Sequence, residues 1–67
     1  MNNEFLKFYG ALNGQEMCVH HIKKDDVHRI SLIGDETCEI AVHAFDTLIV
    51  YTAEVNPNLL AWMGEER

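Results

Sequence analysis

Alternation of apolar and polar side chains from Phe5 to about Thr52 constrains this chain's fold more than any other feature of the sequence. The clearest cases are Met17, Val19 and His21 alternating with Cys18, His20 and Ile22, and Cys38, Ile40, Val42 and Ala44 alternating with Glu39, Ala41 and His43. Successive side chains of a β-strand point to opposite faces of the sheet, so this period of two is typical of strands with one buried face. The sequence therefore predicts a mainly β fold.

The dipeptide Asn13-Gly14 separates residues 5–12 from residues 15–22 and is the strongest short-range signal for a β-hairpin, because a type I′ turn needs positive φ at both positions. A two-residue loop would pair Phe8 with Val19 and Leu6 with His21. One face would then carry Leu6, Phe8, Leu12, Met17 and Val19, and the other Lys7, Tyr9, Cys18 and His20. A helix over residues 4–12, capped by Asn3 and stopped by Gly14, is the alternative. Gly10 disfavours that helix by about 1 kcal/mol, so we expect a strand.

A charged turn at residues 23–26 leads to a predicted third strand over residues 27–33, and residues 34–36 form the next turn before a fourth strand over residues 37–44. A three-residue turn would place Leu32 opposite Cys38 and Ile30 opposite Ile40 on one apolar side. Ser31 would lie opposite Glu39 on the other side. A two-residue turn would scatter polar residues over both faces, so the hydrophobic pattern favours the longer turn.

The fourth strand is expected to end near Phe45-Asp46, and residues 47–52 form a fifth strand rich in β-branched and aromatic residues. Asn56 is a good helix cap and Pro57 suits the first helical position, which predicts a short helix over residues 57–63 that stops at Gly64. The expected architecture is a small five-stranded antiparallel meander or half-barrel with a short C-terminal helix. It forms one domain over residues 1–67.

The 67-residue length limits the core, since a chain this short buries only about 60% of the surface that it exposes when unfolded. Two cysteines are too few for a disulfide scaffold, and no leader or apolar run of about 20 residues is present. We therefore expect a cytoplasmic protein. Some of its 48% apolar residues would be buried between subunits if it forms a homo-oligomer.

The net charge of −6 is unevenly distributed along the chain. Residues 1–34 carry four acidic and four basic side chains, whereas residues 35–67 carry seven acidic side chains and Arg67 as the one base. Such a chain is repelled by phosphate, which argues against direct nucleic-acid binding unless Lys7, Lys23, Lys24 and Arg29 converge on one patch. The acidic half suits a basic partner protein.

Candidate catalytic and metal-binding residues are few. The soft metal ligands are Cys18, His20, His21, His28, Cys38 and His43, and their spacing matches no zinc module. On the second strand, Cys18 and His20 share one side, while the expected register puts Cys38 on the other side of the sheet. There is no glycine-framed nucleophile and no phosphate-binding loop, and the paired acids lie in turns or in the tail. We therefore expect no enzyme activity, no cofactor and no metal.

The function that this pattern favours is a non-catalytic protein–protein interaction module: a small acidic regulator, adapter or inhibitor, of the kind that phages and mobile elements encode, masking a basic partner. The predicted partner-binding residues are turn acids and aromatic anchors, namely Asp35, Glu36, Phe45, Asp46, Tyr51 and Trp62. One alternative is a small-barrel RNA-binding subunit of a homo-oligomer. Another is a metal-stabilised binding module, whose melting temperature a chelator would lower.

Overall fold

The computed structural model describes residues 4–65 and confirms the mainly β fold: five antiparallel strands form one open sheet, and a single short helix follows them. In chain order the elements are β1 (Phe5–Leu12), β2 (Cys18–Lys23), the 3₁₀ turn η1 (Lys24–Asp26), β3 (Val27–Leu32), β4 (Thr37–Ala44), β5 (Thr47–Glu54) and α1 (Pro57–Glu65). Because residues 5–12 form β1, the alternative helix over this segment is wrong.

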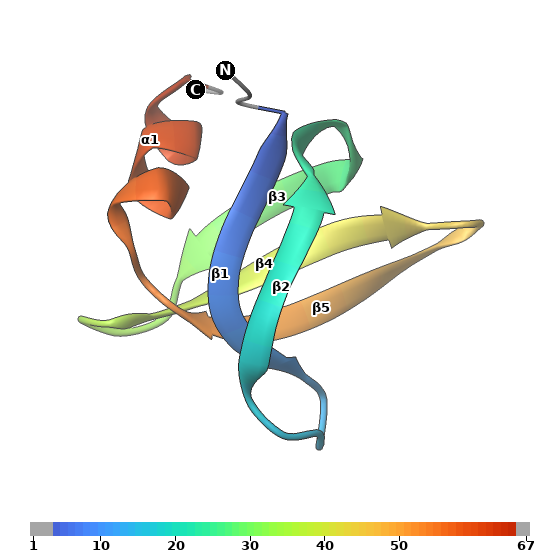
Figure 1. Cartoon of the computed structure of the whole chain (residues 1–67), viewed down its shortest axis with the longest axis horizontal. Coiled ribbons are helices and arrows are strands. Elements are labelled where there is room, and N and C mark those ends of the chain that lie inside the picture. Colours follow the sequence, from blue (N-terminus) through green and yellow to red (C-terminus); the bar gives the residue numbers. More distant parts are fainter. Residues whose placement is uncertain (1–3, 66–67) are drawn as a thin grey trace.

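The strand order in the sheet is β2-β1-β5-β4-β3, so β2 and β3 are its two edges. We call β1 and β2 the two-stranded arm, and β3, β4 and β5 the three-stranded arm. The arms are joined because β1 also pairs with β5, through Gly10, Ala11 and Leu12. In Figure 1 the two-stranded arm crosses the three-stranded arm at a steep angle, and α1 lies to one side of both. The sheet is therefore curled around a core, with its opening between the edge strands.

The predicted register between β3 and β4 is confirmed. The observed pairs include Ile30–Ile40, Ser31–Glu39 and Leu32–Cys38. The turn between β3 and β4 is closed by a hydrogen bond from the Ile33 amide to the Thr37 carbonyl, 2.9 Å long. Leu32 lies at the end of β3 and stays exposed. The ladder shifts register once between Val27 and Arg29, and β5 continues two residues beyond the predicted strand.

The predicted register of the two-stranded arm is wrong by one residue. Phe8 pairs with His20 and Leu6 with Ile22, because the ladder begins only at Gly10–Cys18. Gln15 donates a hydrogen bond to the Leu12 carbonyl, and in this turn only Gly14 has a positive φ, 79°, so it is not type I′. A slip of one residue moves every side chain of a strand to the opposite face.

This slip reverses the two faces predicted for β2. The side chains of His20 and Ile22 lie on the core side, half-buried, opposite Phe8 and Leu6. The side chains of Met17 and Val19, predicted to be in the core, are exposed instead.

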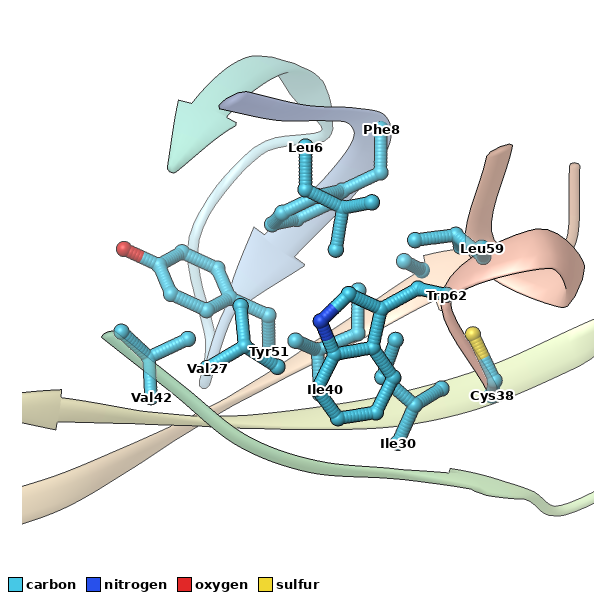
Figure 2. Close-up of a cluster of buried hydrophobic side chains, with 11 residues drawn as sticks. Leu6, Phe8, Val27, Ile30, Cys38, Ile40, Val42, Tyr51, Leu59 and Trp62 are labelled. Atoms are coloured by element: carbon cyan, nitrogen blue, oxygen red, sulfur yellow. The ribbon is translucent and has the colours of Figure 1, made fainter. Parts of the chain in front are cut away.

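The hydrophobic core lies between the two arms and α1, as Figure 2 shows. Its buried side chains are Leu6, Phe8, Val27, Ile30, Cys38, Ile40, Val42, Tyr51, Ala53, Leu59 and Trp62. Leu59 and Trp62 come from α1, which covers the side of the core that the sheet leaves open.

Asn56 starts α1 and fastens it to the sheet. Its side-chain oxygen accepts a hydrogen bond from the Leu59 amide (2.9 Å), and its side-chain nitrogen donates one to the Lys7 carbonyl of β1 (3.1 Å). Asn56 is thus the predicted cap and Pro57 the first helical residue. The helix continues through Gly64 to residue 65, so the predicted stop at Gly64 is wrong.

Gly10 lies where β1 crosses from β2 to β5. A Cβ atom at this position would be 2.6 Å from the Thr52 carbonyl oxygen and 2.8 Å from the Ala53 Cβ. Only glycine therefore allows the backbones of β1 and β5 to approach this closely.

Candidate functional site

Phe45 is the most unusual residue on the surface. It is the first residue of the two-residue loop between β4 and β5. The pair Ala44–Thr47 closes this loop. Its φ is 57°, the one positive value at a non-glycine residue within residues 4–65. Its side chain is fully exposed. A bulky residue at positive φ is a backbone outlier that costs of order 1–3 kcal/mol, and such strain concentrates at functional sites.

The strand pairing below this tip explains why the loop tolerates such a residue. All eight residues of β4 pair with β5 without a slip. Two-residue hairpin loops require positive φ because only primed turns match the twist of the flanking strands. The long ladder therefore imposes the turn geometry on Phe45, although glycine or asparagine would adopt it at lower cost.

Two exposed apolar side chains lie on the outer face of β5 close to the tip. Leu48 pairs with His43 and Val50 pairs with Ala41, and Leu48 and Val50 are each 41% exposed. We call Phe45 and Asp46, together with Leu48 and Val50 that follow them on the β4–β5 hairpin, the hairpin-tip surface. Leu48 and Val50 are not among the partner-binding residues predicted from the sequence. Their outward direction follows from the register, since the same alternation places Ile49 and Tyr51 on the core side.

The predicted partner-binding acids fall into two separate groups. Asp46 lies beside Phe45 on the hairpin tip, whereas Asp35 and Glu36 lie in the exposed turn between β3 and β4. These turns occupy opposite ends of β4, which has eight residues and therefore separates them by roughly 25 Å. In Figure 1 the β3–β4 turn, which contains Asp35 and Glu36, and the β4–β5 turn, which contains Phe45 and Asp46, lie at opposite ends of β4.

The other two predicted anchors, Tyr51 and Trp62, lie in the core (Figure 2). Tyr51 is 9% exposed and packs edge-on against Phe8, with ring centroids 5.4 Å apart. Trp62 is 8% exposed and covers the core from α1. Both side chains are therefore largely buried, and Trp62 also lines a surface hollow with Ile30 and Leu60. Sequence alternation identifies strand faces but does not say which aromatic residue of a strand or helix the core will take.

The four cations of the alternative nucleic-acid surface are spread over several elements. Lys7 and Lys23 lie on the two-stranded arm, Lys24 in η1, and Arg29 on β3 opposite Ala41. Glu4 and Asp25 line a shallow hollow together with Lys23. Carboxylates therefore interrupt the positive charge of this region.

The two cysteines lie in one row across the sheet, Cys18–Gly10–Ala53–Cys38, one residue on each of four strands. Three strand spacings separate them by roughly 14 Å, too far for a disulfide, and both thiols are free. Burial raises the pKa of the Cys38 thiol. Cys18 is exposed, and its Sγ lies 3.4 Å from Nε2 of His20. The sequence predicted this pair on the Tyr9 side of the sheet. Because of the register slip, it lies on the Phe8 side instead.

No group of three or more His, Cys, Asp or Glu side chains within the described part of the chain is arranged to hold a metal ion. No helix between residues 4 and 65 has the length and apolar character needed to cross a membrane. No protein-family model, curated protein or solved structure matches the chain.

Proposed function

We propose that this protein is a non-catalytic interaction module that binds another protein through the hairpin-tip surface, with Phe45 as its anchor. The observation that carries this proposal is the combination of full exposure and positive φ at Phe45. The ring makes no contribution to the core, and its backbone conformation destabilises the fold. A role in binding accounts for both, since buried aromatic anchors supply most of the energy at interfaces.

The rest of the hairpin-tip surface suits a protein partner. Leu48 and Val50 add apolar area beside the ring, and Asp46 supplies a negative charge next to it. The net charge of −6 steers the whole molecule toward a basic protein. The module would act as a small regulator, adapter or inhibitor that covers part of its partner's surface.

Photo-crosslinking from position 45 tests the proposal. Phe45 is replaced by p-benzoyl-phenylalanine, which keeps an aromatic ring at the tip, and the same group at Tyr9 is the matched control. Tyr9 is also an exposed aromatic residue, but it lies on the two-stranded arm. In extracts of the native host we expect one discrete protein adduct from position 45 and not from position 9. The same adducts from both positions, or none from position 45, would contradict the proposal.

The purified partner then allows the anchor to be measured. Phe45→Gly should weaken binding at least about 30-fold, the loss typical of a hot-spot residue, while the fold remains intact. The association rate should also fall as salt is raised, because charge steering is screened. Binding within twofold of the wild type would show that Phe45 is not the anchor.

A further inference from the structure

Cys18 and His20 are two metal-ligating side chains whose donor atoms already lie at the spacing that a metal ion requires. Their Sγ and Nε2 atoms are 3.4 Å apart. In a tetrahedral zinc site, Zn–S and Zn–N bonds of about 2.3 and 2.0–2.1 Å place adjacent sulfur and nitrogen ligands roughly 3.5 Å apart. The pair can therefore hold one ion with little change in either side chain.

The imidazole of His20 is held in place by two aromatic rings. It stacks on Phe8 with ring centroids 5.3 Å apart and lies against Tyr51 at 4.8 Å. Binding a metal would therefore not require ordering of this ring, and rigid ligands lose less entropy on binding. The sulfur of Cys18 is exposed and open to an ion from solution.

One chain supplies only two ligands at this point, so two more must come from elsewhere. β2 is an edge strand of the sheet, which leaves one side of its backbone free to pair with another strand. Val19, midway between Cys18 and His20, is 51% exposed on the opposite face of β2. Of the strands that could pair with this edge, β2 of a second copy of the chain fits best, because of the register in which the two strands would pair.

Antiparallel pairing of two β2 strands about Val19 places each Cys18 opposite His20 of the second copy, on the same face of the joined sheet. Directly opposed residues have Cβ atoms about 4.5–5.5 Å apart. Two thiolates and two imidazoles would then surround one point, which is the Cys₂His₂ set of structural zinc sites. On the other face the two Val19 side chains would contact each other, and Met17 would contact His21 of the second copy.

We propose that two copies of the chain pair through β2 and bind one zinc-like divalent ion between Cys18 and His20 of each copy. Each Cys18 thiol releases its proton to solvent when its sulfur coordinates the ion. The site lies on the two-stranded arm and leaves the hairpin-tip surface free, so the dimer would present two Phe45 anchors. This proposal does not depend on the proposed function, and either one can fail alone.

The test is a titration of the reduced, full-length protein with Zn²⁺, followed by sedimentation equilibrium and a melting curve. We expect one ion per two chains, a doubling of the mass, a higher melting temperature, and reversal of all three by a chelator. Titration with Co²⁺ should give the charge-transfer absorption that thiolate ligation produces.

Three variants locate the site. Cys18→Ser and His20→Phe should both abolish dimerisation by Zn²⁺, and His20→Phe retains a ring between Phe8 and Tyr51. Cys18 is exposed, so the serine variant keeps the fold even if the phenylalanine variant does not. His28→Asn is the matched control, because this histidine is exposed on β3, the opposite edge strand of the sheet, and the variant should bind Zn²⁺ like the wild type.

Three outcomes would overturn the proposal: no Zn²⁺ bound by the wild type at micromolar concentration, one ion bound per chain without dimerisation, or binding that survives Cys18→Ser. The last two would indicate an adventitious ion only.

Discussion

The β1–β2 and β4–β5 hairpins turn the chain with opposite kinds of residue. The β1–β2 turn has Gly14 at a φ of 79° with no neighbouring atom within 4 Å of the place where a Cβ would be. The β4–β5 turn has Phe45 at a φ of 57°, also without packing. The backbone requirement is similar, but only the first turn meets it with a residue that has no steric penalty.

The strand pairing next to the two turns also differs. The two-stranded arm has six pairs and leaves residues 11–17 outside its ladder, whereas β4 and β5 pair over eight residues up to the tip. A long ladder fixes its turn and can carry strain there. Local sequence rules are expected to fail at functional positions, and Phe45 is the position where they fail here.

The largest expected effect concerns the junction between the two arms. Gly10→Ala would place a Cβ 2.6 Å from the Thr52 carbonyl oxygen, and backbone atoms cannot yield as a flexible side chain can. We expect a loss of about 3 kcal/mol in the free energy of unfolding, measured with urea. Gly34→Ala is the control, because a Cβ there meets no atom within 4 Å and should change stability by less than about 0.5 kcal/mol. Equal effects would mean that the arms do not approach closely at Gly10.

The next largest effect on stability is expected at the β1–β2 turn and distinguishes it from the β4–β5 turn. Gly14→Ala forces a side chain into positive φ and should cost about 1–2 kcal/mol, although it meets no neighbouring atom. The free energy of unfolding should fall without a change in the urea dependence of the transition. An unchanged stability would show that the turn can take another conformation.

Phe45→Gly should change the free energy of unfolding in the opposite direction to Gly14→Ala. It removes the strain at positive φ and takes no side chain from the core, while the added freedom of the unfolded chain offsets part of the gain. We expect the free energy of unfolding to stay the same or to rise by up to about 1 kcal/mol. A loss of more than about 1 kcal/mol would show that the ring stabilises the fold, and the argument for a binding role would fail.

The smallest expected effect is on the pH dependence of stability, and it concerns the difference between the buried Cys38 thiol and the exposed Cys18 thiol. Burial raises the pKa of Cys38 in the folded state above that in the unfolded state, so its stabilising contribution is complete below about pH 8.5 and is lost as the pH rises. Between pH 7 and pH 10, the wild type should therefore lose slightly more stability than Cys38→Ala. At pH 8, iodoacetamide should modify Cys18 at once and Cys38 only on unfolding. Rapid modification of both thiols would place Cys38 outside the core.

The register between β3 and β4 was predictable because the alternation of these strands permits only one register that buries Ile30, Cys38 and Ile40 together. The two-stranded arm was not, because Asn13-Gly14 suits more than one turn. No local sequence signal distinguishes the register that buries Val19 from the register that buries Ile22.

The candidate site was predictable only in part. Phe45 and Asp46 followed from the position of a turn, and the separation of Asp35 from Phe45 was implicit in the predicted strand between them. The burial of Tyr51 depends on how the two arms cross, since it packs against Phe8 and His20, and that of Trp62 depends on how α1 meets the sheet. Both are long-range contacts that strand and helix signals do not encode.

The pairing of β1 with β5 also determines when this protein can fold. Gly10 pairs with Ala53, which is 43 positions further along the chain. During synthesis the first strand must therefore remain without its second neighbour until Ala53 has left the ribosome. Contacts between such distant segments slow folding, and a chain released before the fifth strand would expose Leu6 and Phe8 to solvent and to other nascent chains.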